Sequence, residues 1–171
     1  LLEQSIRTLY ANTPADQFNL TLVDSGSDDF RVRRWYSGWT QAYSNLLLVE
    51  LKNAVPVLAQ LKNIGVAASE HRFGRGDWLY LSDNDVFFTP GWMEKLTTVA
   101  ERSEETMFRL WGGQIHPFHQ PISVQPWEMQ SRLMTEHDIL DGPSWLMRWA
   151  TWDKYGPCLL YTSDAADEGL G

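Results

Sequence analysis

The chain has 171 residues, a length that suits one domain with a hydrophobic core. Its 14 Lys and Arg residues stand against 22 Asp and Glu residues, so the formal net charge is -8. This charge disfavours binding to nucleic acid backbones and to anionic membrane surfaces. Hydrophobic residues make up 43% and charged residues 21%, which is the composition of a globular protein and not of a disordered one.

The cysteine content and the hydropathy bear on the compartment. The single cysteine, Cys158, excludes an intramolecular disulfide framework and fits a reducing environment. No run of about 18 apolar residues occurs, so the sequence predicts no membrane span. We therefore expect a cytoplasmic location, while membrane association of a longer parent protein stays open.

Both ends of the chain look like cuts in a longer protein. The sequence starts inside a helical pattern, and residues 158–168 resemble the translated adapter sequence that ends many environmental reading frames. We predict that residues 1–157 form a partial domain and that residues 158–171 are a non-native tail. A native acidic tail is the alternative.

Between the ends, strand and helix patterns alternate. Residues 31–43 mix Arg, Trp and Tyr without a clean period and predict neither element. This alternation predicts an α/β fold, Rossmann-like, with a mostly parallel sheet and helices on both faces. In chain order, the patterns predict a helix over 2–10, strands over 18–23 and 46–51, helices over 54–62 and 65–73, a strand over 78–81, a helix over 91–102, a strand over 106–111, a loop over 113–126, a helix over 127–137, a strand over 144–149 and a short helix over 151–155.

Acidic turns follow two of these strands, where ligands bind in parallel sheets. Asp24 follows one strand, and Asp83 and Asp85 follow another. Two carboxylates spaced i, i+2 at a strand end can reach the same region, and Mg²⁺ or Mn²⁺ binds carboxylate and phosphate oxygens. A metal held there would neutralise a diphosphate and stabilise it as a leaving group. A solvated turn is the alternative.

The same block of sequence carries a resemblance to a known family. Residues 63–68, 76–85 and 90–96 resemble the signature block of family 2 glycosyltransferases: an Asn-x-Gly turn and helix, a strand, an Asp-x-Asp and a Pro-Gly-Trp helix start. Residues 23–28 are similar to the acidic turn after that family's second strand, and residues 142–149 to a later segment near its acceptor site.

This resemblance implies a GT-A-type nucleotide-sugar-binding domain. The implied reaction moves a sugar from a nucleotide-diphosphate sugar to the hydroxyl of a glycan or another acceptor, with inversion at the anomeric centre. By motif position, Asp24 recognises the base or ribose, and Asn63 lies near the nucleotide or braces its loop. Asp83 faces the ribose and the metal, and Asp85 is the firmer ligand of Mn²⁺ or Mg²⁺.

Aromatic and histidine residues add candidates for the acceptor side. Trp111 and Trp145 are predicted to line the acceptor cleft, with core packing as the alternative. His116 and His119 form a His-x-x-His pair, which can indicate a metal site, but on this Pro-rich loop without another placed ligand the pattern favours surface or pocket lining.

Three departures from the family pattern limit the prediction. The family's first strand, which supplies donor contacts, would lie before Leu1, and its catalytic carboxylate usually falls downstream of Gly156, where the sequence becomes adapter-like. Inversion needs a general base, and the nearby carboxylates are Asp141 and Asp153, for which solvation or helix capping is the alternative. Glu70 and His71 stand where many members carry Arg-Asn, so the donor nucleotide is not predicted.

Other functions stay open from the sequence. A sugar-nucleotide nucleotidyltransferase shares the implied fold, but its Gly-rich phosphate loop is not visible. A non-catalytic carbohydrate-binding domain would use some of the nine tryptophans and no metal. An inactive fragment of a transferase is the third alternative.

Overall fold

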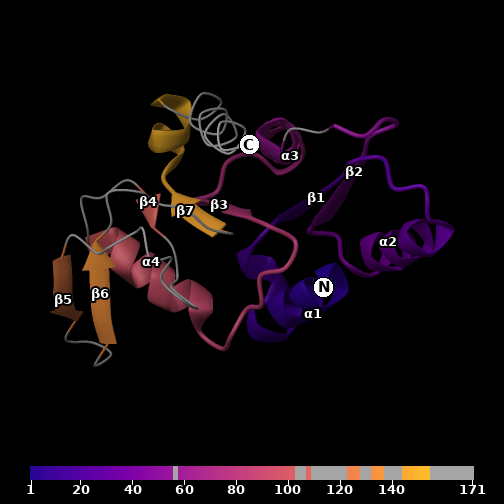
Figure 1. Ribbon diagram of the computed structural model, residues 1–171. Helices are drawn as coiled ribbons and strands as arrows, with labels where there is room; N and C mark the ends of the chain where they lie inside the picture. Colours follow the sequence, from indigo (N-terminus) through magenta and orange to yellow (C-terminus); the bar gives the residue numbers. More distant parts are fainter. Residues whose placement is uncertain (56–57, 103–106, 109–122, 128–131, 137–143, 155–171) are drawn as a thin grey trace, which may run out of the picture.

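The computed structural model describes residues 1–55, 58–102, 107–108, 123–127, 132–136 and 144–154, which form a mixed α/β arrangement (Figure 1). Among these residues, none of the helices has both the length and the apolar character needed to cross a bilayer. The helices are α1 (Leu2–Asn12), α2 (Phe30–Ala42), α3 (Leu58–Phe73) and α4 (Trp92–Arg102), with a 3-10 turn over Ala15–Gln17 and helical residues over 149–154. The strands are β1 (Leu20–Asp24), β2 (Leu46–Glu50), β3 (Leu79–Ser82), β4 (Met107–Phe108), β5 (Ser123–Trp127), β6 (Arg132–Glu136) and β7 (Ser144–Met147).

The described strands pair in three groups. β1 and β2 are parallel, from Leu20 opposite Leu46 to Asp24 opposite Glu50. β7 lies between β3 and β4 and runs antiparallel to both, so β3 and β4 are parallel to each other and are connected through α4. β5 and β6 form an antiparallel pair. The mixed α/β class is therefore confirmed, whereas parallel pairing is confined to β1 and β2 among the described strands.

The expectation of a mostly parallel sheet is wrong at β7, which pairs antiparallel with both β3 and β4. The predicted helix over 127–137 is wrong, since Trp127 ends β5 and Arg132–Glu136 form β6. The predicted loop over 113–126 is likewise wrong for residues 123–126, which belong to β5.

Two helices differ from the sequence prediction. Residues 30–42, which showed no clean period, form α2, and Asp29 caps this helix by accepting a hydrogen bond from the Arg31 amide. The helices predicted over 54–62 and 65–73 form one continuous helix, α3, because Gly65 stays in helical geometry; this helix begins at Leu58, and residues 54 and 55 are not helical. A glycine weakens a helix interior by about 1 kcal/mol but does not break it.

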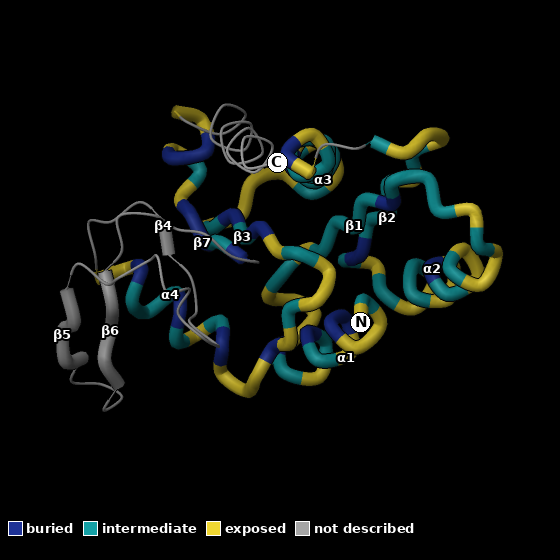
Figure 2. The backbone as a smooth tube through the Cα atoms, viewed as in Figure 1, coloured by how far each residue is buried: buried dark blue, intermediate teal, exposed yellow. Residues whose placement is uncertain are grey.

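Side-chain alternation along β3 directs two hydrophobic clusters to opposite faces of the β3–β7 sheet. Leu79 and Leu81 pack with residues of α3, whereas Tyr80 packs against the cluster centred on α4. The prediction of helices on both faces thus holds for this sheet (Figures 1 and 2). The cluster on the α4 side contains Leu9, Phe88, Trp92, Leu96, Ala100 and Leu146, and the cluster on the α3 side contains Ala59, Val66, Leu79, Leu81, Met147 and Trp152.

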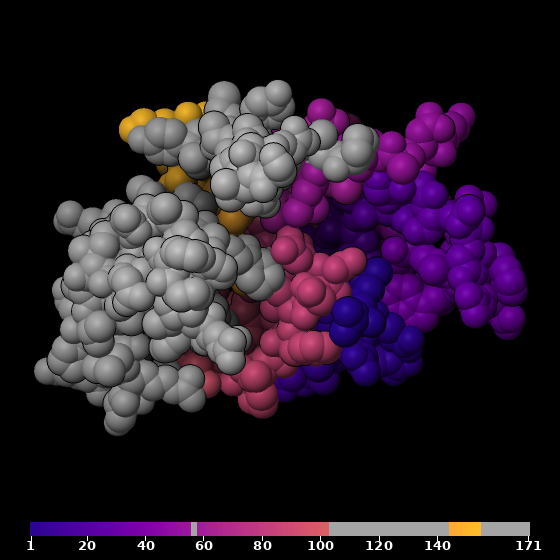
Figure 3. All heavy atoms as spheres, in the orientation of Figure 1, coloured from indigo at the N-terminus to yellow at the C-terminus, as the bar shows by residue number. Residues whose placement is uncertain are grey.

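Helix α1 fixes the chain that follows β3. The Asn12 side chain donates to the Phe88 carbonyl at 2.8 Å, and the Phe88 amide donates to the Thr8 hydroxyl at 3.1 Å. The buried Trp92 indole donates to the Thr13 hydroxyl at 2.7 Å. Figure 3 shows α1 (indigo) packed beside the segment that leads from β3 into α4 (pink). The acidic turn between β3 and Phe88 is therefore anchored at both ends.

Candidate functional site

Asp83 lies one residue beyond β3 and faces helix α3. Alternation along the strand puts Asp83 on the side of Leu79 and Leu81, which pack against α3. From that helix, the Lys62 Nζ atom approaches the Asp83 Oδ1 atom to 3.1 Å. Lys62 is 11% exposed and Asp83 is 31% exposed. The contact is an ion pair without hydrogen-bond geometry, because this Oδ1 atom accepts no hydrogen bond from the described residues.

Asp85 differs from Asp83 in its surroundings. It lies in the turn after β3 and is exposed. Within the described part of the chain, its carboxylate makes no ion pair or hydrogen bond. Lys62 pairs with Asp83, and Asp85 stays unpaired among the residues that the structure describes, so the turn after β3 is open and negatively charged.

Trp145 borders the same turn. It lies on β7 opposite Leu81, and its ring centroid is 4.6 Å from the Lys62 Nζ atom, within the range of a cation–π contact. Its indole Nε1 atom is buried without a hydrogen-bond partner among the described residues. The residue predicted for the acceptor cleft thus lies beside Lys62 and close to the acidic turn.

Gly65 explains how α3 reaches the site. A Cβ atom at this glycine would lie 3.1 Å from the Val23 Cγ2 atom, so the absence of a side chain allows α3 to pack closely on β1. Asn63 lies on the same stretch of α3, and its Oδ1 atom is buried with no partner among the described residues. Because Lys62 contacts Asp83 and Gly65 contacts Val23, this stretch of α3 connects the carboxyl ends of β1 and β3.

Asp24 ends β1 in a turn that is closed by its own side chain. The Asp24 Oδ1 atom accepts hydrogen bonds from the Ser27 hydroxyl at 2.6 Å and from the Ser27 amide at 3.3 Å. Ser25 accepts at 2.7 Å from the Val55 amide, and Gly26 adopts a φ of 78° with its backbone against Asn53 and Ala54. Asp24 is 6% exposed, so this carboxylate is already engaged in the protein.

Asp83 and Asp85 can hold a divalent ion only if other ligands complete its coordination. The described residues contain no group of three or more His, Cys, Asp or Glu side chains that could hold a metal. Mg²⁺ is commonly held by one or two carboxylates, with phosphate and water oxygens completing its octahedron. Asp83 and Asp85 supply such carboxylates, and Asp85 is free to bind. The donor set therefore fits a metal that is shared with a phosphate ligand.

The carboxylate Asp153 lies away from this turn. β7 is antiparallel to β3, so the helical residues that follow β7 lie near Leu79, at the opposite end of β3 from Asp83. Arg75 donates to both Asp153 oxygens, at 2.8 and 2.9 Å, and also to Glu70. Hydrogen bonds from Arg75 lower the pKa of Asp153, which weakens it as a base. Both observations argue against Asp153 as the general base.

Four candidates from the sequence lie outside the described residues. Asp141, the other base candidate, is one of them. The predicted cleft residue Trp111 and the pair His116 and His119 are the others.

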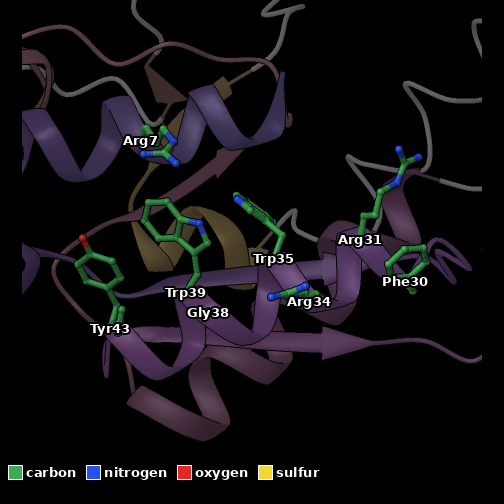
Figure 4. Close-up of a pocket in the computed structure, with 9 residues that line it drawn as sticks. Arg7, Phe30, Arg31, Arg34, Trp35, Gly38, Trp39 and Tyr43 are labelled. Atoms are coloured by element: carbon green, nitrogen blue, oxygen red, sulfur yellow. The ribbon is translucent and has the colours of Figure 1, made fainter.

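A second concave region lies between α1 and α2 (Figure 4). The pocket has a volume of about 590 Å³. Trp35 and Trp39 of α2 and Tyr43, which follows the last residue of α2, are spaced four residues apart, with ring centroids 5.8 and 5.3 Å apart. Arg7 of α1 lies over the Trp39 ring at 6.0 Å. Sequence reasoning missed this surface, although the four-residue spacing of the three rings was a readable signal.

Lys62 was also missed. It lies three residues after Ala59 and four before Val66, both buried on the face of α3 that packs on β3. A lysine on an apolar helical stripe was the available signal. The prediction of a helix break between 62 and 65 hid that stripe.

Comparison of the chain with protein-family models, with curated proteins and with solved structures finds no match. The fold class therefore rests on the described helices and strands. The resemblance to family 2 glycosyltransferases rests on the sequence motifs alone.

Proposed function

We propose that this chain is the donor-binding part of a metal-dependent glycosyltransferase with a GT-A-type fold. The proposed reaction moves a sugar from a nucleotide-diphosphate sugar to a hydroxyl of a glycan or another acceptor. The observation that carries the proposal is the open acidic turn after β3, in which Asp85 is exposed and Asp83 faces α3. A cytoplasmic location stays a prediction from the sequence.

The proposed roles follow from the chemistry of a diphosphate leaving group. Asp83 and Asp85 would hold Mn²⁺ or Mg²⁺, which supplies Lewis-acid stabilisation of the departing diphosphate. The acceptor oxygen attacks the anomeric carbon from the face opposite the diphosphate, so the configuration inverts. The acceptor proton passes to a base, for which Asp141 is the remaining candidate from the sequence.

Electrostatics support a metal at this turn. The chain carries a net charge of -8, and the turn itself presents two carboxylates. A diphosphate would be repelled by this surface unless a cation lay between the two. We assign the nucleoside end of the same ligand to the turn after β1. Helix α3 connects this turn to the turn after β3 through Gly65 and Lys62.

The proposal is tested by thermal unfolding of the chain with Mn²⁺ and a panel of uridine, guanosine and thymidine diphosphates. A ligand that binds only the folded state stabilises it by about 2.7 kcal/mol at a hundredfold excess over its Kd. We expect stabilisation that requires both Mn²⁺ and one nucleotide, and that is lost in the Asp83→Ala/Asp85→Ala double variant. A folded wild-type chain without any shift would refute donor binding by this chain.

The aromatic pocket between α1 and α2 favours one alternative, a carbohydrate-binding domain. Tryptophan and tyrosine faces pack against the apolar faces of sugars, and Trp39 and Tyr43 are stacked at 20° on an open surface. The two functions separate by mutation. Trp39→Ala should abolish glycan binding by a lectin and spare nucleotide binding by a transferase, and Asp85→Ala should do the reverse.

A further inference from the structure

Lys62 is a cation that the sequence motifs leave unassigned. Its side chain is 11% exposed, and its Nζ atom lies between the Asp83 Oδ1 atom at 3.1 Å and the Trp145 ring centroid at 4.6 Å. Lysine is seldom buried without a partner, and the neighbours at 59 and 66 on the same helical face are apolar. The ammonium therefore occupies a specific position beside the acidic turn.

This position conflicts with a metal on the same carboxylate. A divalent ion bound through Asp83 Oδ1 would be a few ångströms from the ammonium, and two cations at that separation repel each other strongly. The lysine stem has four flexible carbons, so the ammonium can leave the carboxylate while its stem stays packed on α3. The Trp145 ring offers the ammonium a second favourable contact during that movement.

We propose that Lys62 is a donor-binding residue that exchanges partners: it pairs with Asp83 when no metal is bound, and it pairs with the diphosphate of the donor when metal occupies Asp83 and Asp85. This inference rests on the proposed function. Without ligand, the ion pair neutralises the charge of Asp83 alone, and the exchange of partners couples metal binding to diphosphate binding.

The charges of the site agree with this exchange. Asp83, Asp85 and one divalent ion sum to zero, so the two negative charges of a sugar-nucleotide diphosphate need a further cation. A lysine ammonium binds phosphate as a compact point charge. Among the described residues, Lys62 is the basic side chain that an ion pair joins to the acidic turn.

The test measures two equilibria in the whole chain: Mn²⁺ alone, followed by the electron spin resonance of the free ion, and the nucleoside diphosphate panel at saturating Mn²⁺, followed by calorimetry. Lys62→Met keeps the packing of the stem and removes the charge. We expect it to bind Mn²⁺ alone about threefold more tightly, since a competing ion pair is lost. We expect it to bind the nucleoside diphosphate about tenfold more weakly, since a charged hydrogen bond is lost.

Two further variants separate the causes. Lys62→Arg keeps the charge and should retain most of the nucleotide affinity. Lys95→Met makes the same charge change on α4, where the lysine donates to the Pro90 carbonyl, and should leave both equilibria unchanged. Thermal unfolding of each variant verifies that it is folded.

Lys62→Met is expected to strengthen Mn²⁺ binding and to weaken nucleotide binding, so each measurement can contradict the exchange. If Lys62→Met leaves both equilibria unchanged while the wild type binds Mn²⁺ and nucleotide, the exchange is wrong and donor binding survives. If Lys62→Met weakens Mn²⁺ binding, the lysine only positions Asp83, and the exchange is again wrong. If the wild type binds neither ligand, the proposed function fails and the exchange fails with it.

Discussion

The two acidic turns at the carboxyl ends of β1 and β3 look alike in sequence and differ in structure. Asp24 is buried and its Oδ1 atom accepts two hydrogen bonds from Ser27. After β3, Asp85 is exposed, and Asp83 meets only the ammonium of Lys62 among the described residues. The first turn uses its acidic group to hold its own geometry, whereas the second pairs Asp83 with a lysine and presents Asp85 to solvent.

This contrast separates a carboxylate that holds its own turn from one that is free to bind a ligand. A carboxylate whose lone pairs are satisfied by its own turn stabilises the fold, and its removal costs stability. A carboxylate that is exposed and unpaired contributes little to stability, so its removal should affect ligand binding alone. Substitutions in the two turns should therefore have opposite consequences.

The largest loss of stability is expected for Gly26→Ala in the turn after β1. The new Cβ atom would lie 3.0 Å from the Ala54 amide nitrogen, and the residue has a φ of 78° that disfavours alanine. Backbone strain and overpacking together should lower the free energy of unfolding by about 3 kcal/mol. Denaturant unfolding measures this change.

Gly74→Ala is the matched control for that variant. Gly74 has a φ of 76°, but a methyl group added there would meet no atom within 4 Å. Only the strain of a left-handed backbone then applies, which is about 1 kcal/mol. Equal losses in the two glycine variants would show that contact with Ala54 does not close the β1 turn.

Asp24→Ala should come next, with a loss of about 2 kcal/mol. The substitution removes the acceptor of two hydrogen bonds and leaves the partly buried Ser27 donors unpaired. A double-mutant cycle with Ser27→Ala measures the coupling between the two side chains. Additive losses would mean that the turn is not held by this pair.

Substitutions in the turn after β3 should lower the free energy of unfolding much less. Asp83→Ala should cost about 1 kcal/mol, because it leaves the nearly buried Lys62 ammonium without its carboxylate. Asp85→Ala should stay within about 0.5 kcal/mol of the wild type, because its exposed side chain has no described partner. A loss at Asp85 as large as at Asp24 would remove the distinction between the two turns.

The smallest effect is expected at Asp153 and appears as a pH dependence. Hydrogen bonds from Arg75 lower the pKa of this carboxyl below its ordinary 3.8 in the folded protein. The folded state therefore gains stability above pH 3.8, and this gain is lost as the pH falls through the lowered pKa. Asp153→Asn should be slightly less stable than the wild type at about pH 7, and the two should converge in acid. Parallel curves at all pH values would contradict this linkage.

Local patterns predicted much of the framework. Polar turns bound the apolar runs that form β1, β2 and β3. The Pro-Gly pair predicted the start of α4 to within one residue. The residues over 132–136 include Leu, Met and Glu, which favour helices, yet they form β6 because pairing with β5 outweighs local propensity.

The candidate site was predictable only in part. Asp83 and Asp85 could be found because they follow a short apolar strand directly. The engagement of Asp24 by Ser27 and the pairing of Lys62 with Asp83 could not, because both depend on three-dimensional geometry. The lysine lies 21 positions before its partner and on another element, so no spacing rule connects the two.

Donor binding at the open turn is tested by a calorimetric titration of Mn²⁺ with nucleoside diphosphate into the wild type, Asp85→Ala and Asp24→Asn. We expect binding by the wild type and at least about a tenfold loss in Asp85→Ala at unchanged thermal stability. Asp24→Asn keeps an acceptor for Ser27 and measures how much the turn after β1, which is predicted to bind the nucleoside, contributes to the same affinity. Equal affinity of Asp85→Ala and the wild type would show that the open turn after β3 is not the donor site.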